Sequence, residues 1–247
     1  MIMDRKGEFT DMDSGLFPEP RFQSVGDRAL LVEYGDRIDP ECNRKVRAVA
    51  ALCQSRPIPG VIEVVPAYRS LQIVYNPLEA GPAELEASIR SLEERLETME
   101  PPSGSVVKIP VCYGQEFGPD LSFVAEHNGL SPDEVIAVHS GTHYLIYMLG
   151  FTPGFPFLGG LDQRLHTPRR ESPRIEVPKG AVGIANGQTG IYPLSSPGGW
   201  QLIGRTPHTL FQPHQDRPTS YAPGDTLVFV PISREEYLQR EQEDGHG

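Results

Sequence analysis

Glycine and proline are concentrated in residues 150–207 of this 247-residue chain, and this concentration limits what the chain can form. The stretch contains 11 of the 25 glycines, 8 of the 25 prolines and the single tryptophan. Glycine permits positive φ and close backbone approach, whereas proline fixes φ, so only short strands joined by shaped loops are expected. Flexible linkers are rich in Gly and Ser, but here Phe, Tyr, Ile and Trp alternate with the turn-forming residues. The sequence therefore predicts rigid loops around a pocket.

The same stretch is locally positive, with six basic residues against three acidic ones, in a chain of net charge −11. The basic residues are Arg164, Arg169, Arg170, Arg174, Lys179 and Arg205. Guanidinium groups match the paired oxygens of carboxylates and phosphates, so this positive island predicts an anionic ligand. The alternative is that these arginines pair with carboxylates elsewhere in the fold or are solvated.

The composition excludes several classes of protein. With 38% hydrophobic and 22% charged residues, the chain is typical of a soluble globular protein, and its acidic balance argues against nucleic acid or an anionic membrane as partner. No apolar run approaches the roughly 20 residues that span a bilayer, and the first residues have no hydrophobic signal core, which predicts a cytoplasmic protein. Three cysteines without a C-x-x-C pair indicate reduced thiols.

Regular patterns before residue 100 predict a small α+β domain at 21–100, preceded by a flexible tail at 1–20. Strands are expected on both sides of a turn at 25–28. Further strands are expected at 60–65 and 70–75, because apolar residues alternate there and Pro or Gly flank the runs.

Two helices complete this domain. The first follows Asp39, a good N-cap, and has Pro40 at its first position. Its apolar face is expected to contain Cys42, Val46, Val49, Ala50 and Cys53. The second begins at Pro82, and its apolar positions continue to Met99. The run Pro-Pro-Ser-Gly at 101–104 breaks the pattern and marks the domain boundary.

A second domain is predicted at 105–232, followed by a polar tail at 233–247 without special chemistry. It opens with a strand at 106–113 and two helices at 119–126 and 132–138, the latter with a Ser-x-x-Glu capping box. Further short strands are expected at 142–148, 174–177, 181–185, 189–192, 199–204, 210–211 and 226–230. Short strands with turn signals about every ten residues favour a closed β-barrel.

Common catalytic motifs are absent: the sequence has no P-loop, G-x-G-x-x-G, G-x-S-x-G or H-E-x-x-H. His139 and His143 have the spacing of a metal pair on a helix, but Gly141 lies between them and a strand pattern follows. Either histidine is instead a candidate general base or substrate contact, because imidazole titrates near neutrality. A structural histidine is the alternative.

Two loops are candidate pocket walls. Residues 150–160 place three phenylalanines among four glycines and two prolines, which predicts a stiff loop lining an apolar recess rather than a strand. Simple packing under a loop is the alternative. Residues 195–200 place two serines before a Gly-Gly turn, whose N–H groups are expected to form an anion-binding nest. A tight hairpin and a catalytic serine remain alternatives there.

Several motifs together resemble the PxpB/KipI family, the B subunits of prokaryotic 5-oxoprolinase, once called allophanate hydrolase subunit 1. They are GFTPGFPFLGGLD from Gly150, the Pro-Arg-Arg and Pro-Arg motifs within 168–174, YPLSSPGGW from Tyr192, IGRTP from Ile203, and SVGDRAL from Ser24. The resemblance extends over about residues 21–232. It implies the α+β class, with a small N-terminal α+β domain followed by a cyclophilin-like β-barrel domain.

The resemblance also implies a function. Family members take part in the ATP-dependent opening of 5-oxo-L-proline to L-glutamate, together with a PxpC/KipA-like cyclophilin-like subunit and a PxpA/LamB-like subunit. ATP with Mg²⁺ is then a co-substrate, and no bound metal or prosthetic group is expected in this chain. Two alternatives remain, an inhibitor of a sporulation histidine kinase and a partner in a urea- or allophanate-type carboxyltransferase.

These considerations give a set of predicted site residues. The predicted catalytic residues are His139 and His143. Predicted to bind substrate or phosphate are Arg169, Arg170, Arg174, Gln188, Ser196, Gly198 and Gly199. Predicted to form the pocket wall are Phe151, Phe155, Phe157, Tyr192 and Trp200.

Overall fold

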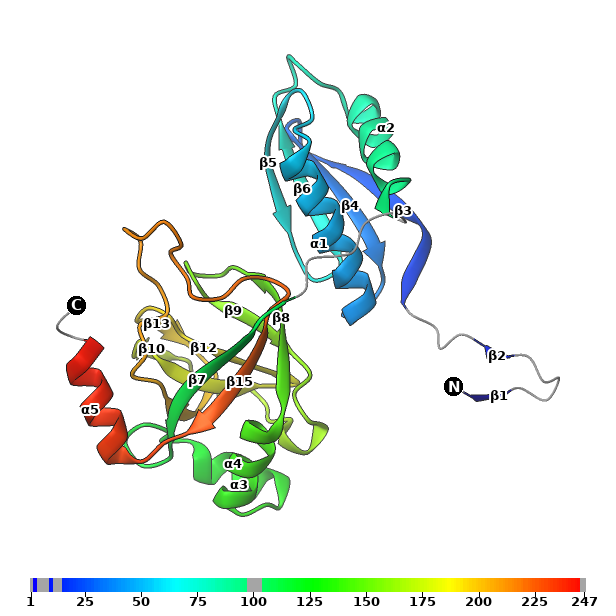
Figure 1. Cartoon of the computed structure of the whole chain (residues 1–247). Coiled ribbons are helices and arrows are strands. Elements are labelled where there is room, and N and C mark those ends of the chain that lie inside the picture. Colours follow the sequence, from blue (N-terminus) through cyan, green and yellow to red (C-terminus); the bar gives the residue numbers. More distant parts are fainter. Residues whose placement is uncertain (1, 4–8, 11–14, 97–103, 245–247) are drawn as a thin grey trace. The chain divides into compact units, whose positions relative to one another are not determined.

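The computed structural model describes residues 2–3, 9–10, 15–96 and 104–244, which belong to two units (Figure 1). The first unit extends to residue 102 and the second begins at residue 103. Met99 and most of the predicted breaker at 101–104 lie outside the described residues. Each unit has its own hydrophobic core.

The first unit contains a four-stranded antiparallel sheet in the order β3-β4-β6-β5. Its strands are β3 (Leu16–Val25), β4 (Ala29–Gly35), β5 (Val61–Pro66) and β6 (Ser70–Tyr75). The predicted turn at 25–28 joins β3 to β4, as expected. Strand β3 begins at Leu16 because Leu16 pairs with Gly35 and packs against the core. Residues 16–20 are therefore not part of a flexible tail, which corrects that prediction. Two short strands, β1 (Ile2–Met3) and β2 (Phe9–Thr10), pair with each other.

Helices α1 (Pro40–Ser55) and α2 (Pro82–Glu93) cover one face of this sheet (Figure 1). The predicted cap of α1 is confirmed, because Asp39 Oδ1 accepts hydrogen bonds from the backbone N–H groups of Glu41 (2.8 Å) and Cys42 (3.2 Å). The predicted apolar face of α1 is buried. Helix α2 ends earlier than expected, although Leu96 still packs against the core.

The second unit is built on a seven-stranded sheet in the order β12-β11-β14-β7-β15-β8-β9. Its strands are β7 (Val106–Tyr113), β8 (His143–Leu149), β9 (Pro156–Gly159), β11 (Ala181–Ala185), β12 (Gln188–Ile191), β14 (Gln201–Arg205) and β15 (Thr226–Pro231). The edge strands β9 and β12 contact each other, so the sheet curls into a nearly closed barrel. Strands β7 and β15 are parallel, and the other pairs are antiparallel. A separate ribbon pairs β10 (Arg174–Val177) with β13 (Ser196–Gly198). The predicted α+β class with a barrel is confirmed.

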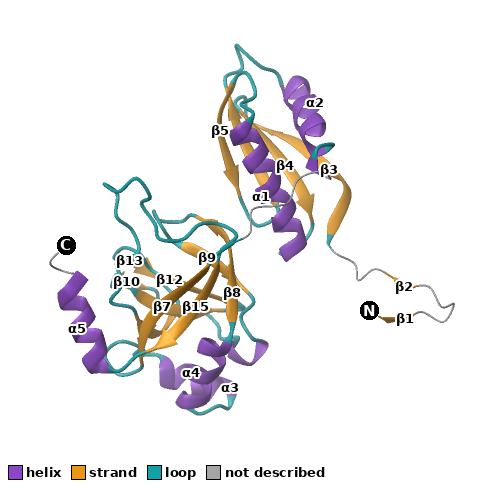
Figure 2. Cartoon of the chain, in the orientation of Figure 1, coloured by secondary structure: helices purple, strands orange, loops and turns teal. Residues whose placement is uncertain are grey.

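Helices α3 (Leu121–Asn128) and α4 (Pro132–Gly141) lie together at one end of the barrel (Figure 2). Ser131 and Glu134 form the predicted capping box, with Ser131 N donating to Glu134 Oε2 at 2.7 Å. A short 3₁₀ helix, η2, spans Gln163–Leu165, and α5 spans Arg234–Asp244. Tyr237 of α5 is buried against Cys112 and Phe117. Residues 234–244 therefore form a helix that packs against the unit rather than a merely polar tail.

Strand predictions for the second unit were wrong at three places, one of them β13, where residues 195–200 were expected to form a binding loop. Residues 156–159 form β9, although they were expected to belong to a loop. Proline is tolerated at the first residue of an edge strand, where Pro156 lies, and Gly159 is needed because a Cβ there would overlap the ring of Tyr147. Residues 210–211 form no strand, and Phe211 makes only an isolated bridge to Thr219. Within the described residues, no helix has the length and apolar character that crossing a membrane requires.

Candidate functional site

A pocket of about 430 Å³ opens where three segments of the second unit meet, at 151–157, 169–173 and 192–200. We call it the aromatic pocket. Its lining consists of Phe151, Phe155, Phe157, Arg169, Pro173, Tyr192, Pro197, Gly198, Gly199 and Trp200. The structure thus brings together all five predicted wall aromatics, one of the three predicted arginines and both predicted glycines.

Phe155 is the centre of the aromatic wall. Its ring makes edge-to-face contacts with Phe157 (5.1 Å between centroids), Phe151 (5.6 Å), Tyr192 (5.6 Å) and Trp200 (5.8 Å). Such pairs contribute about 0.5–1.5 kcal/mol each beyond the burial of their area. Phe155 is only 2% exposed, whereas Phe151 at the rim is 68% exposed. The wall is therefore fixed at its back and open at its front.

Two glycines at the aromatic wall leave no room for a side chain, because aromatic rings lie close to their backbone. A Cβ on Gly190 would lie 2.9 Å from Phe155 Cζ, and one on Gly198 would collide with the hydroxyl of Tyr192. Gly198 and Gly199 do not have positive φ, and Gly198 pairs with Arg174 in the β10–β13 ribbon. An anion-binding nest needs alternating backbone conformations of opposite hand, so the predicted nest is not formed.

Arg169 is the cation of the aromatic pocket. Its side chain is exposed, and it has no hydrogen-bond or ion-pair partner in the part of the chain that the structure describes. A guanidinium in this position offers its donors to an incoming carboxylate or phosphate. Of the two alternatives, pairing with a carboxylate is not seen for Arg169 among the described residues. Its exposure fits the other alternative, simple solvation, as well.

Arg170 and Arg174 instead bind Asp120, and we call these three residues the arginine–aspartate network. Arg174 Nη2 donates to Asp120 Oδ1 and Oδ2, both at 2.7 Å, and Arg170 Nη1 donates to Oδ1 at 3.3 Å. The backbone N–H of Leu202 donates to Oδ2 at 2.6 Å. Arg174 is therefore held by a structural carboxylate partner, whereas Arg170 makes a single, longer contact with the same carboxylate and remains 37% exposed. Arg164 is likewise paired, with Asp162.

The network also holds the pocket wall in place. Arg174 Nη1 donates to the carbonyl of Trp200 (3.2 Å), and the backbone N–H of Arg170 donates to the carbonyl of Gly199 (2.8 Å). Asp120 precedes α3 and is 54 residues away from Arg174 in sequence. Sequence reasoning missed Asp120, because nothing local distinguishes it from an ordinary residue at the start of a helix.

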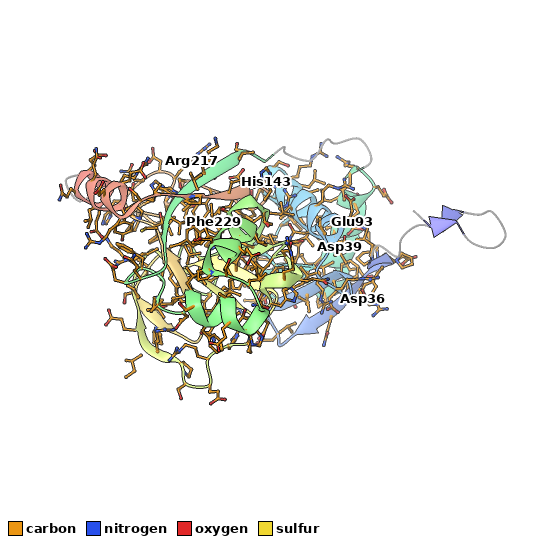
Figure 3. All side chains as sticks on the ribbon, turned by 90° about the horizontal axis from the view of Figure 1, so that it is seen from below. Asp36, Asp39, Glu93, His143, Arg217 and Phe229 are labelled. Atoms are coloured by element: carbon orange, nitrogen blue, oxygen red, sulfur yellow. The ribbon has the colours of Figure 1, made fainter. Side chains whose placement is uncertain are left out.

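His139 is buried in the core and does not line the aromatic pocket. It stacks on Phe229, which Figure 3 labels, with ring centroids 4.5 Å apart. Its Nδ1 is 2.8 Å from Tyr113 Oη, and its Nε2 is 2.9 Å from Thr189 Oγ1. Burial lowers the pKa of His139 to about 3. A neutral imidazole with both nitrogens occupied does not act as a general base at neutral pH, so the structural alternative fits.

The other polar candidates do not line the aromatic pocket either. His143 is exposed at the start of β8, and Gln188 begins β12, opposite Ala185 in the hairpin. Ser196 Oγ is buried, with no hydrogen-bond partner among the described residues. Ser195 Oγ donates to Glu176 Oε1 at 2.8 Å rather than to a histidine. A catalytic serine at 195–196 therefore has no geometric support.

Known proteins match this chain over most of its length. A family model described as the carboxyltransferase domain, subdomain C and D, matches residues 20–221. The B subunit of 5-oxoprolinase from Bacillus subtilis is 45% identical over 233 residues, which are 90% of this chain and 97% of that protein. Its counterpart of the same name from Escherichia coli O157:H7 is 40% identical, covering 84% of this chain and 94% of that protein.

Solved structures share the fold, and a more distant relative matches in sequence. The crystal structure of TTHA0988 has a TM-score of 0.76 and 39% identity over 83% of this chain, which corresponds to only 40% of that longer chain. Urea amidolyase from Lachancea kluyveri is 26% identical, and the match covers 94% of this chain but 14% of that protein. The urea carboxylase of Kluyveromyces lactis, at 20% identity and a TM-score of 0.76, shows the fold alone.

Proposed function

The chain belongs to the carboxyltransferase subdomain C and D family, and from that premise we propose that it is the B subunit of a 5-oxoprolinase. Such an enzyme opens 5-oxo-L-proline to L-glutamate with hydrolysis of ATP. The observation that carries the proposal is the 45% identity over nearly the full length of the Bacillus subtilis protein of that name. The urea amidolyases are more distant, and this chain matches only a small part of them, so the urea-type alternative has less support.

The reaction needs an activated lactam, because amide resonance makes 5-oxoproline a poor electrophile. In the proposed sequence the lactam oxygen attacks the γ-phosphorus of ATP, an O–P bond forms, and ADP leaves with the electron pair of the broken bond. Water then adds to the lactam carbon, the C–N bond breaks, and the nitrogen takes up a proton. A second water releases inorganic phosphate from the resulting acyl phosphate. The products are L-glutamate, ADP and phosphate.

The aromatic pocket has the features needed to bind the lactam substrate. Binding sites for small molecules are typically apolar recesses with a few placed polar groups, and about 430 Å³ exceeds what a five-membered lactam needs. Trp200 and the phenylalanines supply the apolar walls, and Arg169 supplies the positive charge for the substrate carboxylate or the transferring phosphoryl group. The unfilled volume is consistent with a site that another subunit completes.

The proposed partners are a PxpC/KipA-like subunit and a PxpA/LamB-like subunit, working in the cytoplasm with Mg·ATP. In the part of the chain that is described, no group of three or more His, Cys, Asp or Glu side chains could hold a metal ion. Mg²⁺ is proposed to enter with ATP as part of the substrate, because metal ions bridge the β- and γ-phosphate oxygens in phosphoryl transfer.

The proposal is tested by purifying the chain with its candidate partner subunits and measuring ATP-dependent release of glutamate from 5-oxoproline. Arg169→Ala is expected to reduce kcat/KM about 100-fold, because it removes the charge that faces the pocket. Arg164→Ala is the matched control, since Arg164 pairs with Asp162 outside the pocket, and it should retain wild-type activity.

Each outcome has a separate meaning. Full activity of the Arg169→Ala complex would overturn the role of the aromatic pocket. No glutamate release from an assembled wild-type complex would overturn the proposed reaction, and inhibition of histidine kinase autophosphorylation by the same preparation would favour the inhibitor.

A further inference from the structure

A second cavity, of about 540 Å³, lies beside the aromatic pocket, and the two share Arg169. We call it the side cavity. Its lining consists of Asp120, Phe123, Pro168, Arg169, Arg170, Glu171, Ser172 and Gln201. None of these except the two arginines was predicted as a site residue. The shared arginine means that a ligand in each cavity would approach the same guanidinium.

Phe123 gives the side cavity a flat apolar surface. It lies on α3, is 47% exposed, and stacks on His127 one helical turn later, with centroids 6.0 Å apart and ring planes at 23°. A phenylalanine that is half exposed at a cavity, next to arginines, is the arrangement on which nucleic-acid bases stack. The neighbouring histidine ring restricts the orientation of the phenylalanine ring.

The charged residues that line the side cavity are two arginines, Arg169 and Arg170, and two carboxylates, Asp120 and Glu171. Asp120 is nearly buried, and its closest ion pair is with Arg174, which does not line the cavity. Arg170 is held by Asp120 through one contact at 3.3 Å, and its side chain is 37% exposed. Arg169 has no partner in the described part of the chain. Glu171 is the opposing charge, and it is exposed.

We infer that the side cavity is the nucleotide compartment of the site, with the base of ATP on Phe123 and its phosphates directed to Arg170 and Arg169. The inference rests on the proposed function. A nucleotide in this position places its terminal phosphate near Arg169, at the border with the aromatic pocket. A lactam in the aromatic pocket then meets the γ-phosphate at that border, as transfer to its oxygen requires.

The test compares two exposed phenylalanines in the assembled complex, one from each cavity. Phe123→Ala is expected to raise KM for ATP about 5- to 100-fold, the usual effect of losing one base-stacking ring, while KM for 5-oxoproline stays the same. Phe151→Ala is expected to raise KM for 5-oxoproline and to leave KM for ATP unchanged. Phe123→Trp should restore KM for ATP, because it keeps a stacking surface. Ile175→Ala, at a residue that is 92% exposed and lines neither cavity, serves as the neutral control.

Several results would overturn the inference. It fails if Phe123→Ala leaves KM for ATP unchanged while the complex is active, or if both phenylalanine variants raise both KM values alike. It also fails if Phe123→Ala and Phe123→Trp give the same KM for ATP. Thermal unfolding of each variant separates these results from loss of folding.

The inference can also be decided without turnover. If the wild-type complex releases no glutamate, the proposed function fails, and calorimetric titration of this chain with Mg·ATP replaces the kinetic test. Binding by the wild type that is weakened by Phe123→Ala and kept by Phe123→Trp supports the side cavity. Absence of binding, or equal binding by all three proteins, overturns it.

Discussion

The buried back of the aromatic pocket and its exposed rim use the same residue types for different purposes. At the back, Phe155 packs against four rings. Arg174, which does not line the pocket but supports its wall through the carbonyl of Trp200, makes two 2.7 Å hydrogen bonds to Asp120. At the rim, Phe151 is mostly exposed, and Arg169 has no partner among the described residues. The two phenylalanines are four residues apart, and the two arginines are five apart. Residue type alone therefore does not assign a role, whereas burial and partners do.

The difference should be visible as a separation between stability and activity. Removing a buried ring leaves a cavity, and removing one member of a buried ion pair leaves an uncompensated charge. An exposed side chain without partners contributes little to stability. The back is thus expected to determine folding and the rim to determine binding.

The largest loss of stability is expected for Phe155→Ala. Deleting a buried phenylalanine that contacts four aromatic rings should lower the free energy of unfolding by about 3–5 kcal/mol. Urea denaturation followed by circular dichroism measures the effect, and Phe151→Ala provides the comparison at the rim. A loss below about 1 kcal/mol at Phe155 would contradict the division between back and rim.

Asp120→Ala should rank second, with a loss of about 3 kcal/mol, because Arg174 is left largely buried without its counter-charge. The double variant Asp120→Ala with Arg174→Met should recover much of that loss, since it removes both charges. If the double variant is less stable than Asp120→Ala alone, then the penalty does not arise from the unpaired arginine. Activity should fall in Asp120→Ala as well, because the network holds the carbonyls of Gly199 and Trp200.

The third effect depends on pH and concerns His139, the buried member of the histidine pair. Its pKa is about 3 in the folded chain, against about 6.5 when unfolded. Above pH 6.5 the imidazole is neutral in both states. As the pH falls below 6.5 the unfolded chain binds a proton that the folded chain does not, so stability is lost. Between pH 8 and pH 5 this group should lower the free energy of unfolding by about 2 kcal/mol.

Denaturation at several pH values measures this dependence. His139→Gln should show a flatter dependence than the wild type. Equal slopes for the wild type and His139→Gln would show that another group is responsible.

The smallest effect on stability is expected at Arg169. Its replacement by alanine should change the free energy of unfolding by no more than about 0.5 kcal/mol, because the side chain is exposed and unpartnered within the described residues. The same variant is expected to lose most of its activity in the complex, so rank in stability and rank in activity should be opposite. A large loss of stability in Arg169→Ala would remove the distinction between rim and back.

Much of the fold could be predicted from local patterns. The cap at Asp39, the apolar face of α1 and the short strands of the second unit depend on residues that are close in sequence. Strand β9 could not be predicted in this way, because Pro156 and Gly159 usually interrupt strands. They are accepted there because β9 is at the edge of the sheet and Gly159 makes room for Tyr147.

The candidate site was predictable in its aromatic part but not in its electrostatics. Five aromatic residues converge because they come from strand β9 and from neighbouring segments of one barrel, and their spacing among glycines and prolines signals this. Which arginines are paired depends on Asp120, which lies about 50 residues away in sequence and leaves Arg169 without a partner among the described residues. The burial of His139 between Tyr113 and Thr189 likewise depends on contacts with β7 and β12, which a local pattern does not reveal.

The position of β7 in the second unit has a consequence for biosynthesis. This strand is made first, yet its neighbours in the sheet are β14 and β15, which leave the ribosome about 90 to 120 residues later. The described elements of the first unit are complete by residue 96, so that unit can fold during translation, whereas the barrel must wait for nearly the whole chain. Until then both edges of β7 have unpaired N–H and C=O groups, which can pair with strands of other chains. A ribosome that stops before residue 226 would therefore release an aggregation-prone product with a folded N-terminal unit.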